Sequence, residues 1–238
     1  PMGGMHKIIE GMVALAEEQG VEIKLNQEVQ KIYVTNGHAT KVITADTEYE
    51  ADVVVGGADY HHVDQHLLEE RVRNYTPEYW DKRVMAPSSL LFYLGVDKKL
   101  KNLHHHNLFF DEDFKKHAVE IYDDPQWPSK PLFYACVPSI TDPAVAPEGK
   151  ENLFLLVPLA PDLEDTPELR EKYYHIIMDR LEELTGQEVR KHIIYKRSFA
   201  HRDFEKDYYA YKGNAYGLAN TLLQTAFLKP KLRSKKVK

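Results

Sequence analysis

The chain has 238 residues, of which 43% are apolar and 29% charged, and its net charge is −6. This composition supports a sizeable core and does not favour a disordered chain, and the length suits one large domain or two interleaved ones. Cys136 is the only cysteine, which excludes an intramolecular disulfide and, without a partner chain, a thiolate zinc site. A single cysteine also favours a reducing, cytoplasmic setting. No apolar run approaches the roughly 20 residues that span a bilayer.

The charge is unevenly distributed along the chain. Residues 229–238, KPKLRSKKVK, carry six basic residues and no acid, so the rest of the chain is more acidic than the total indicates. Such an acidic body argues against nucleic acid as the main partner. We interpret the tail as a solvated charge run. The alternative is contact with anionic lipid, worth about 1 kcal/mol per basic residue near such a surface.

The N-terminal part predicts a helix followed by a short strand. Apolar residues recur at helical spacing over residues 5–19, and Gly20 suits the left-handed conformation that ends a helix. The run VEIKL, residues 21–25, alternates as a strand does.

A hairpin and a buried strand are predicted next. Residues 28–45 read as two strands around Asn36-Gly37, a pair that favours a type I′ turn. The run ADVVVGG, residues 51–57, is apolar on both faces, as expected of a strand covered on each side.

Beyond Asp59 the pattern changes to aromatic-rich strands separated by long polar connections. A helix is expected between Thr166, a good N-cap, and Gly186, a good C-terminal stop. Residues 201–228 begin polar, turn through two glycines and are expected to end in an apolar helix. Strands are predicted at 88–96, 106–111, 131–139, 152–160 and 192–200. The whole predicts a mixed α/β, or α+β, fold.

Few motifs for known chemistry are present. Asp59, His62 and His66 share one helical face and could ligate a metal, but this spacing is common by chance and no HExxH motif follows. The run His104–His106 falls in a predicted loop, so we expect no metal site. The sequence also lacks GxSxG, GxGxxG and GxxxxGK[ST], and Cys136 reads as a small buried hydrophobe.

The end of the predicted strand at residues 51–57 has two interpretations. Gly56, Gly57 and Ala58 present almost no side chain, so a ligand or another backbone could approach closely there. Alternatively, the segment is a tight turn into a helix that Asp59 caps. The residues alone leave both interpretations open.

The sequence resembles a known flavoprotein family. PMGGMHKIIEGMVALAEEQGVEIKLNQEVQKI is similar to a block of the flavin-dependent amine oxidase, GDP-dissociation-inhibitor and phytoene desaturase superfamily. EADVVVGGADYHHVDQHLL, APSSLLFYLGV, HHNLFFDEDF and KGNAYGLANTLLQTAFLKP resemble the bacterial-type carotenoid desaturases. The resemblance covers the whole chain. It implies an FAD enzyme, peripheral to the membrane, that desaturates a C40 carotene, with quinone or oxygen as electron acceptor.

The resemblance also assigns residues. Glu28-Val29 would meet the adenine end of FAD, and Gly56, Gly57 and Ala58 would approach the flavin. Asp59, His61 and His62 are candidates for the catalytic base by location only. The residues expected to line the substrate channel are Phe92, Tyr93, Leu94, Phe109, Phe133 and Phe154, with Tyr216 and Leu218 as its gate. Ordinary core residues are the alternative for each strand position.

The sequence departs from the family at both ends. It lacks the glycine-rich dinucleotide turn and the C-terminal flavin segment, so we expect a fragment that is inactive and does not retain FAD. The expected domains are part of an FAD domain with its β-meander (1–60), a substrate domain (61–200) and a return segment (201–238). The rival functions are a lipid-binding protein of the dissociation-inhibitor type and a flavin amine oxidase.

Overall fold

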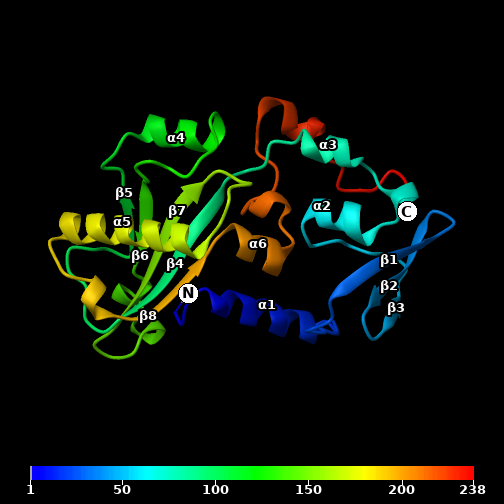
Figure 1. Ribbon diagram of the computed structural model, residues 1–238. Coiled ribbons are helices and arrows are strands. Elements are labelled where there is room, and N and C mark those ends of the chain that lie inside the picture. Colours follow the sequence, from blue (N-terminus) through cyan, green and yellow to red (C-terminus); the bar gives the residue numbers. More distant parts are fainter. Residues whose placement is uncertain (1) are drawn as a thin grey trace. The chain divides into compact units, whose positions relative to one another are not determined.

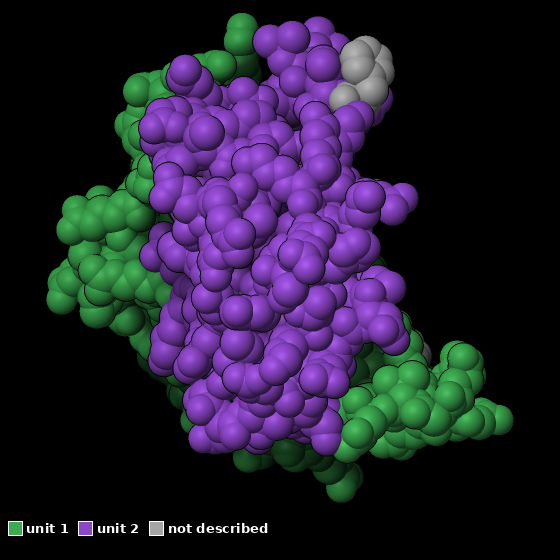
Figure 2. Space-filling view, turned by 90° about the vertical axis from the view of Figure 1, so that its right-hand side faces the viewer, with its two compact units in different colours: residues 1–23, 88–202 green, residues 24–87, 203–238 purple. Residues whose placement is uncertain are grey.

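The computed structural model describes residues 2–238, and the side chain of Phe227 is not described. The chain forms two compact units, residues 1–23 with 88–202 and residues 24–87 with 203–238 (Figure 2). The two units are defined by which residues contact one another, whereas the domains expected from the sequence (1–60, 61–200 and 201–238) were defined by their expected roles. The expected domain assignment therefore stays a prediction.

The first unit is built on a five-stranded antiparallel sheet with the strand order β5-β6-β7-β4-β8 (Figure 1). Every strand lies within a segment predicted from the sequence or extends it by one residue. The mixed α/β fold class is therefore confirmed. The strands are β4 (Ser88–Val96), β5 (His106–Phe109), β6 (Phe133–Cys136), β7 (Glu151–Leu159) and β8 (Ile193–Phe199).

Helix α5 (Pro167–Thr185) covers one face of this sheet (Figure 1). The Thr166 hydroxyl accepts a hydrogen bond from the Leu169 N–H at 3.2 Å, and Gly186 ends the helix at φ 64°, as predicted. Its apolar stripe joins alternate residues of β4, β6 and β7 in one core. Each fully buried aliphatic or aromatic side chain there contributes about 1.5–3 kcal/mol. The helix supplies Tyr173, Tyr174, Ile177, Met178 and Leu181.

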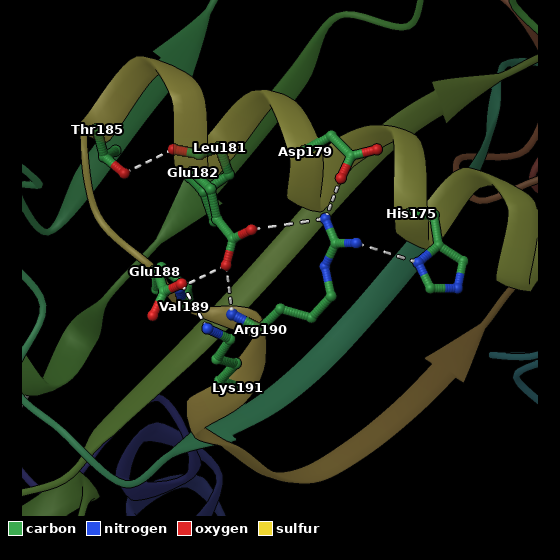
Figure 3. Close-up of polar contacts among 9 residues, drawn as sticks. All are labelled: His175, Asp179, Leu181, Glu182, Thr185, Glu188, Val189, Arg190 and Lys191. Atoms are coloured by element: carbon green, nitrogen blue, oxygen red, sulfur yellow. Dashed lines mark hydrogen bonds and ion pairs between the residues drawn. The ribbon is translucent and has the colours of Figure 1, made fainter.

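The end of α5 is fastened to the turn that leads into β8 (Figure 3). One carboxylate oxygen of Glu182 accepts the N–H groups of Val189 and Arg190, each at 2.6 Å. The Arg190 guanidinium pairs with Asp179 and lies 3.6 Å from Glu182. These contacts fix the direction in which the chain leaves the helix.

Two further helices belong to this unit, α1 (His6–Glu18) and α4 (Phe114–Tyr122). The N–H groups of Gly3 and Gly4, just before α1, donate to the Asp142 carboxylate at 2.5 and 3.3 Å. The prediction of α1 is confirmed, but none of its residues is buried. Met5, Ile8, Ile9, Met12 and Leu15 are all exposed.

The second unit contains a β-meander of β1 (Val29–Thr35), β2 (His38–Thr44) and β3 (Glu48–Glu50). The predicted hairpin is confirmed: Asn36 and Gly37 have φ of 51° and 77°, the positive values that a type I′ turn requires. Short helices follow in this unit. They are α2 (Tyr60–His62), the π-helical turn Val63–Leu67 and α3 (Pro77–Asp81), while α6 (His201–Tyr208) begins at the end of the first unit.

Three predicted elements are wrong. Residues 21–25 and 51–57 form no strand, and Val53 and Val55 are 77% and 88% exposed. An apolar run becomes a strand only when another strand pairs with it, and no described strand does so here. Residues 215–228 form short 3₁₀ turns rather than an apolar helix. No described helix has the length and apolarity that a membrane crossing needs.

A buried ion pair joins the start of α5 to the end of the sheet. Asp165 accepts Arg170 Nε at 2.6 Å and Nη2 at 2.5 Å, and also the Arg202 N–H at 3.0 Å. Its side chain is only 1% exposed. Burial raises the pKa of Asp165, but the bonds from Arg170 and Arg202 outweigh it, so the pKa lies below its ordinary value of 3.8.

We predict that Arg170→Met lowers the free energy of unfolding by about 3 kcal/mol, because it leaves the Asp165 carboxylate buried without its partner. Urea denaturation at pH 7 measures this loss. The matched control is Lys196→Met, which breaks an exposed pair with Glu171 and should cost under about 1 kcal/mol.

The stability that the Arg170–Asp165 pair contributes depends on pH. A lowered pKa means that the stabilisation is present above pH 3.8 and is lost as the pH falls through the folded-state pKa of Asp165. The difference between the parent chain and Arg170→Met should therefore shrink in acid. Equal stability of the two proteins at pH 7 would contradict the assignment.

Candidate functional site

The second unit contains a cavity of about 720 Å³ next to the end of the segment at residues 51–57. This volume lies within the range of small-molecule sites. Gly56 and Ala58 line it, together with the start of the following helical turn. Apolar walls come from Ile32, Ala39, Val53, Val54, Val63 and Leu68.

The basic tail closes part of this cavity. The Lys238 N–H donates to the Gly37 carbonyl at 2.7 Å, and the Lys238 carbonyl accepts the Ala39 N–H at 3.1 Å. Leu232, Arg233 and Ser234 line the cavity. The backbone of the tail therefore lies along the meander, while its six basic residues are all exposed to solvent, as expected of a solvated charge run.

The two glycines before Asp59 differ in what they permit. A Cβ at Gly56 would lie 3.2 Å from a methyl group of Val63, so a larger residue there would require the Val63 side chain to shift by a few tenths of an ångström. A Cβ at Gly57 would meet nothing within 4 Å. Neither Gly56 nor Gly57 has a positive φ, so the backbone conformation does not require glycine at either position. Gly57 therefore has no steric requirement for glycine, whereas Gly56 packs closely on Val63 and borders the cavity together with Ala58.

Asp59 caps α2, as one sequence interpretation predicted. Its Oδ1 accepts the N–H groups of His61 and His62 at 2.9 and 3.3 Å. The carboxylate is therefore partly occupied by the backbone, which fixes the orientation of the two histidines that follow.

His61 and His62 each stack on a tyrosine from the distant end of the chain. The His61 and Tyr211 ring centroids are 3.8 Å apart, and those of His62 and Tyr209 are 4.0 Å apart. Burial lowers the pKa of both histidines below 6.5, so both are neutral at pH 7. Each neutral ring can accept a proton.

The cavity also contains a buried acid, Asp64, that is fully engaged. Its carboxylate accepts the Asn74 N–H at 2.8 Å, the Tyr75 N–H at 3.3 Å and Trp80 Nε1 at 3.2 Å. Gln65 Nε2 donates to it as well, at 2.8 Å. Asp64 therefore holds the loop at 74–80 in place and has little capacity left for a ligand.

Glu28 and Val29 lie at the start of β1. The Glu28 carboxylate accepts a hydrogen bond from the Tyr209 hydroxyl. Val29 packs against the small core of this unit together with Val54 and Val63. Neither residue lines the cavity, so the structure does not bring them together with Gly56 and Ala58.

In the first unit, the sheet face opposite α5 carries an aromatic row. Strand pairing places Tyr93 opposite Phe154 and Phe154 opposite Cys136. The ring centroids of Tyr93 and Phe154 are 5.3 Å apart, and those of Phe154 and Tyr134 are 6.3 Å apart. Tyr93 is 40% exposed. We refer to Tyr93, Tyr134 and Phe154 as the aromatic row.

The other residues expected along the channel lie on the opposite face. Phe92, Leu94 and Phe133 are at most 2% exposed and belong to the core under α5, and Phe109 stacks on Phe133 at 4.4 Å. This placement matches the alternative considered for each of them, ordinary core packing. Of the six, Tyr93 and Phe154 lie on the sheet face opposite α5, where Tyr93 is exposed and Phe154 is half-buried.

The expected gate residues lie in the second unit. The segment around Tyr216 and Leu218 pairs with residues 84–87: the Ala86 N–H donates a hydrogen bond to the Gly217 carbonyl at 2.8 Å. Gly217 has φ 79° and accordingly favours glycine. Tyr216 is 70% exposed and Leu218 is half-buried beside Met85. Tyr216 and Leu218 stay predicted gate residues.

Sequence reasoning missed Tyr134, Tyr209 and Tyr211. Tyr134 joins the aromatic row only through strand register, which no local pattern reports. Tyr209 and Tyr211 reach the histidines across almost 150 residues of chain. Asp59, His62 and His66 do not form a three-ligand metal cluster among the described residues.

The comparisons with known proteins agree with one another. The chain is 42% identical over 238 residues to a carotenoid 3,4-desaturase of Haloarcula japonica, covering 100% of this chain and 48% of that protein. It is 30% identical over 240 residues to a 4,4′-diapophytoene desaturase of Staphylococcus haemolyticus, with 96% and 48% covered. The chain thus spans about half the length of these curated relatives.

The solved structures and the family profile extend this result. An oxidoreductase from Methanosarcina mazei has a similar fold, with a TM-score of 0.58, 21% identity, and 84% of this chain and 43% of that chain covered. The sequence profile described as "flavin containing amine oxidoreductase" matches residues 1–238, from one end of the chain to the other. By its whole length, therefore, this chain belongs to the flavin-containing amine oxidoreductase family.

Proposed function

We propose that this chain is part of an FAD-dependent desaturase that removes hydrogen from a C40 carotene in carotenoid biosynthesis. The main support is the 42% identity that extends over the whole chain to a carotenoid 3,4-desaturase. The aromatic row on the sheet face opposite α5 supports the same substrate class, because aromatic rings offer apolar contact.

The residues present fit part of an FAD site. Gly56 and Ala58 border a cavity of about 720 Å³ whose walls are mainly apolar. The cofactor's pyrophosphate needs a glycine-rich turn at a helix N-terminus, and the sequence contains no such motif. We therefore propose that these 238 residues contribute to flavin binding, with Glu28 and Val29 toward the adenine, but do not retain FAD alone.

The substrate dictates what the chain's own side chains do. A carotene has no hydrogen-bonding groups, so it can be recognised only through apolar contact and shape. Tyr93 and Phe154 would form one wall of its channel, and Tyr216 and Leu218 would form the gate. FAD, when bound, supplies the acceptor for the hydride that leaves the substrate, and a proton leaves with it.

The proton needs an acceptor, and His61 and His62 suit this role. Both are neutral at pH 7 because burial lowers the pKa of each. Asp59 is a weaker candidate, since its Oδ1 already accepts two backbone N–H groups. Its role would then be to position the two histidines.

The proposed setting is cytoplasmic and peripheral to a membrane, because carotenes dissolve in bilayers. A quinone or oxygen would reoxidise the flavin. A lipid-binding protein without flavin remains the rival and predicts a colourless protein.

The proposed function is tested on the longer polypeptide that contains this chain, purified with FAD. Mixed anaerobically with liposomes that carry a carotene, it should lose its flavin absorption while the polyene bands shift to longer wavelength. As a control, the 238-residue chain should lose FAD during gel filtration. A colourless longer protein that still binds the carotene would support the lipid-binding rival instead.

In the same longer protein, Tyr93→Ala and Phe154→Ala should each lower kcat/KM for the carotene about tenfold, since each removes apolar contact worth about 1.5 kcal/mol. The flavin spectrum should stay unchanged. Tyr122→Ala is the matched control, because Tyr122 is 59% exposed on α4. Equal losses in all three variants would remove the aromatic row from the channel.

If His61 or His62 is the proton acceptor, its replacement by Gln should lower the desaturation rate more than tenfold without loss of flavin. The pKa of each histidine is lowered, so the rate should hold down to pH 6.5 and fall only in more acid solution. Unchanged rates in His61→Gln, His62→Gln and Asp59→Asn would exclude all three residues.

A further inference from the structure

Three potential metal ligands meet at the edge of the five-stranded sheet. The β5–β6 ladder places His106 directly opposite Cys136, so their side chains emerge on the same face. His105 precedes β5, and its carbonyl accepts the Val137 N–H at 2.8 Å. The backbone on both sides of the cluster, at His105–His106 and at Cys136–Val137, is thus held by hydrogen bonds. One ligand atom from each of His105, His106 and Cys136 lies within 4.8 Å of the other two.

Hydroxyl groups orient both imidazole rings. His105 Nδ1 contacts Thr141 Oγ1 at 2.5 Å, and His106 Nδ1 contacts the Tyr134 hydroxyl at 2.5 Å. The two ring centroids are 4.2 Å apart. Metal-binding histidines are commonly held in this way by a polar group on one ring nitrogen, which restricts rotation of the ring.

The chemistry of the three side chains selects the ion. One thiolate and two imidazoles suit borderline-soft divalent ions such as zinc, whereas magnesium and calcium prefer oxygen ligands. Tetrahedral coordination at the usual Zn–N and Zn–S lengths places ligand atoms about 3.5 Å apart. The present separations, all within 4.8 Å, are compatible with this geometry if the side chains close on the ion. His106 is exposed and His105 and Cys136 are half-buried, so an ion can enter from solvent.

We propose that His105, His106 and Cys136 bind one zinc ion, with water as the fourth ligand and with Thr141 and Tyr134 orienting the two imidazoles. By sequence, the one cysteine excludes a thiolate zinc site, and no metal site is expected at His104–His106. The proposed site departs from both expectations, because strand pairing brings two of these histidines to the one thiolate. Cys136 lies opposite Phe154 of the aromatic row, so the ion would tie the edge strand β5 to the face that carries this row. The site does not depend on the proposed desaturation.

The single cysteine makes the test specific. In the 238-residue chain, any thiol reaction and any thiolate-to-metal absorption come from Cys136 alone. Equimolar zinc should slow the reaction of Cys136 with a thiol reagent at least tenfold, and cobalt(II) should produce a thiolate-to-cobalt charge-transfer band. Titration should give one ion per chain.

Variants separate this site from adventitious binding. Cys136→Ser should abolish the cobalt band, and His105→Ala and His106→Ala should each weaken zinc binding at least tenfold. His104→Ala is the matched control, because His104 is the adjacent exposed histidine outside the cluster and should bind as the parent chain does. Circular dichroism checks that each variant is folded.

Any of three results would overturn the proposal. The first is absence of binding at millimolar zinc. The second is zinc binding that leaves the reactivity of Cys136 unchanged in the parent chain, a measurement that needs no variant. The third is equal weakening in His104→Ala and His106→Ala, which would indicate binding by surface histidines.

Discussion

The packing of α5 against one face of the five-stranded sheet is the constraint on which the rest of the first unit depends. Side chains alternate across a strand, so covering one face assigns every second residue to the core and leaves its neighbours on the other side. Phe92 and Tyr93 are adjacent in sequence, yet one is 1% and the other 40% exposed. The position of the aromatic row on the opposite face is therefore a direct result of where α5 lies.

The same constraint explains how far sequence reasoning could reach. The five strands and α5 follow from local signals, namely β-rich aromatic runs, a Thr cap and a terminal Gly. Local signals do not report which face a helix covers. Phe92, Leu94 and Phe133 consequently looked equivalent to Tyr93 and Phe154 until the register was known.

The second unit shows a different limit. The hairpin at Asn36-Gly37 and the Asp59 cap depend on neighbouring residues; the hairpin was predicted correctly, and the cap was one of two interpretations that the residues left open. The strand at 51–57 was not, because a strand also needs partners, and the described residues provide none for it. Contacts between His61 and Tyr211 join distant segments, so no window of sequence could show them. Of the proposed zinc ligands, Cys136 is likewise brought to the two adjacent histidines only by strand pairing.

Helix α1 has a consequence for the dynamics of the chain. It has 13 residues and no buried side chain, and isolated helices of that length are marginal in water because their stability normally comes from packing. Its backbone hydrogen bonds should accordingly open at low free-energy cost, and its amide protons should exchange with solvent far faster than those of α5. Because its apolar stripe from Met5 to Leu15 is exposed, packing of this stripe against another surface would stabilise the helix.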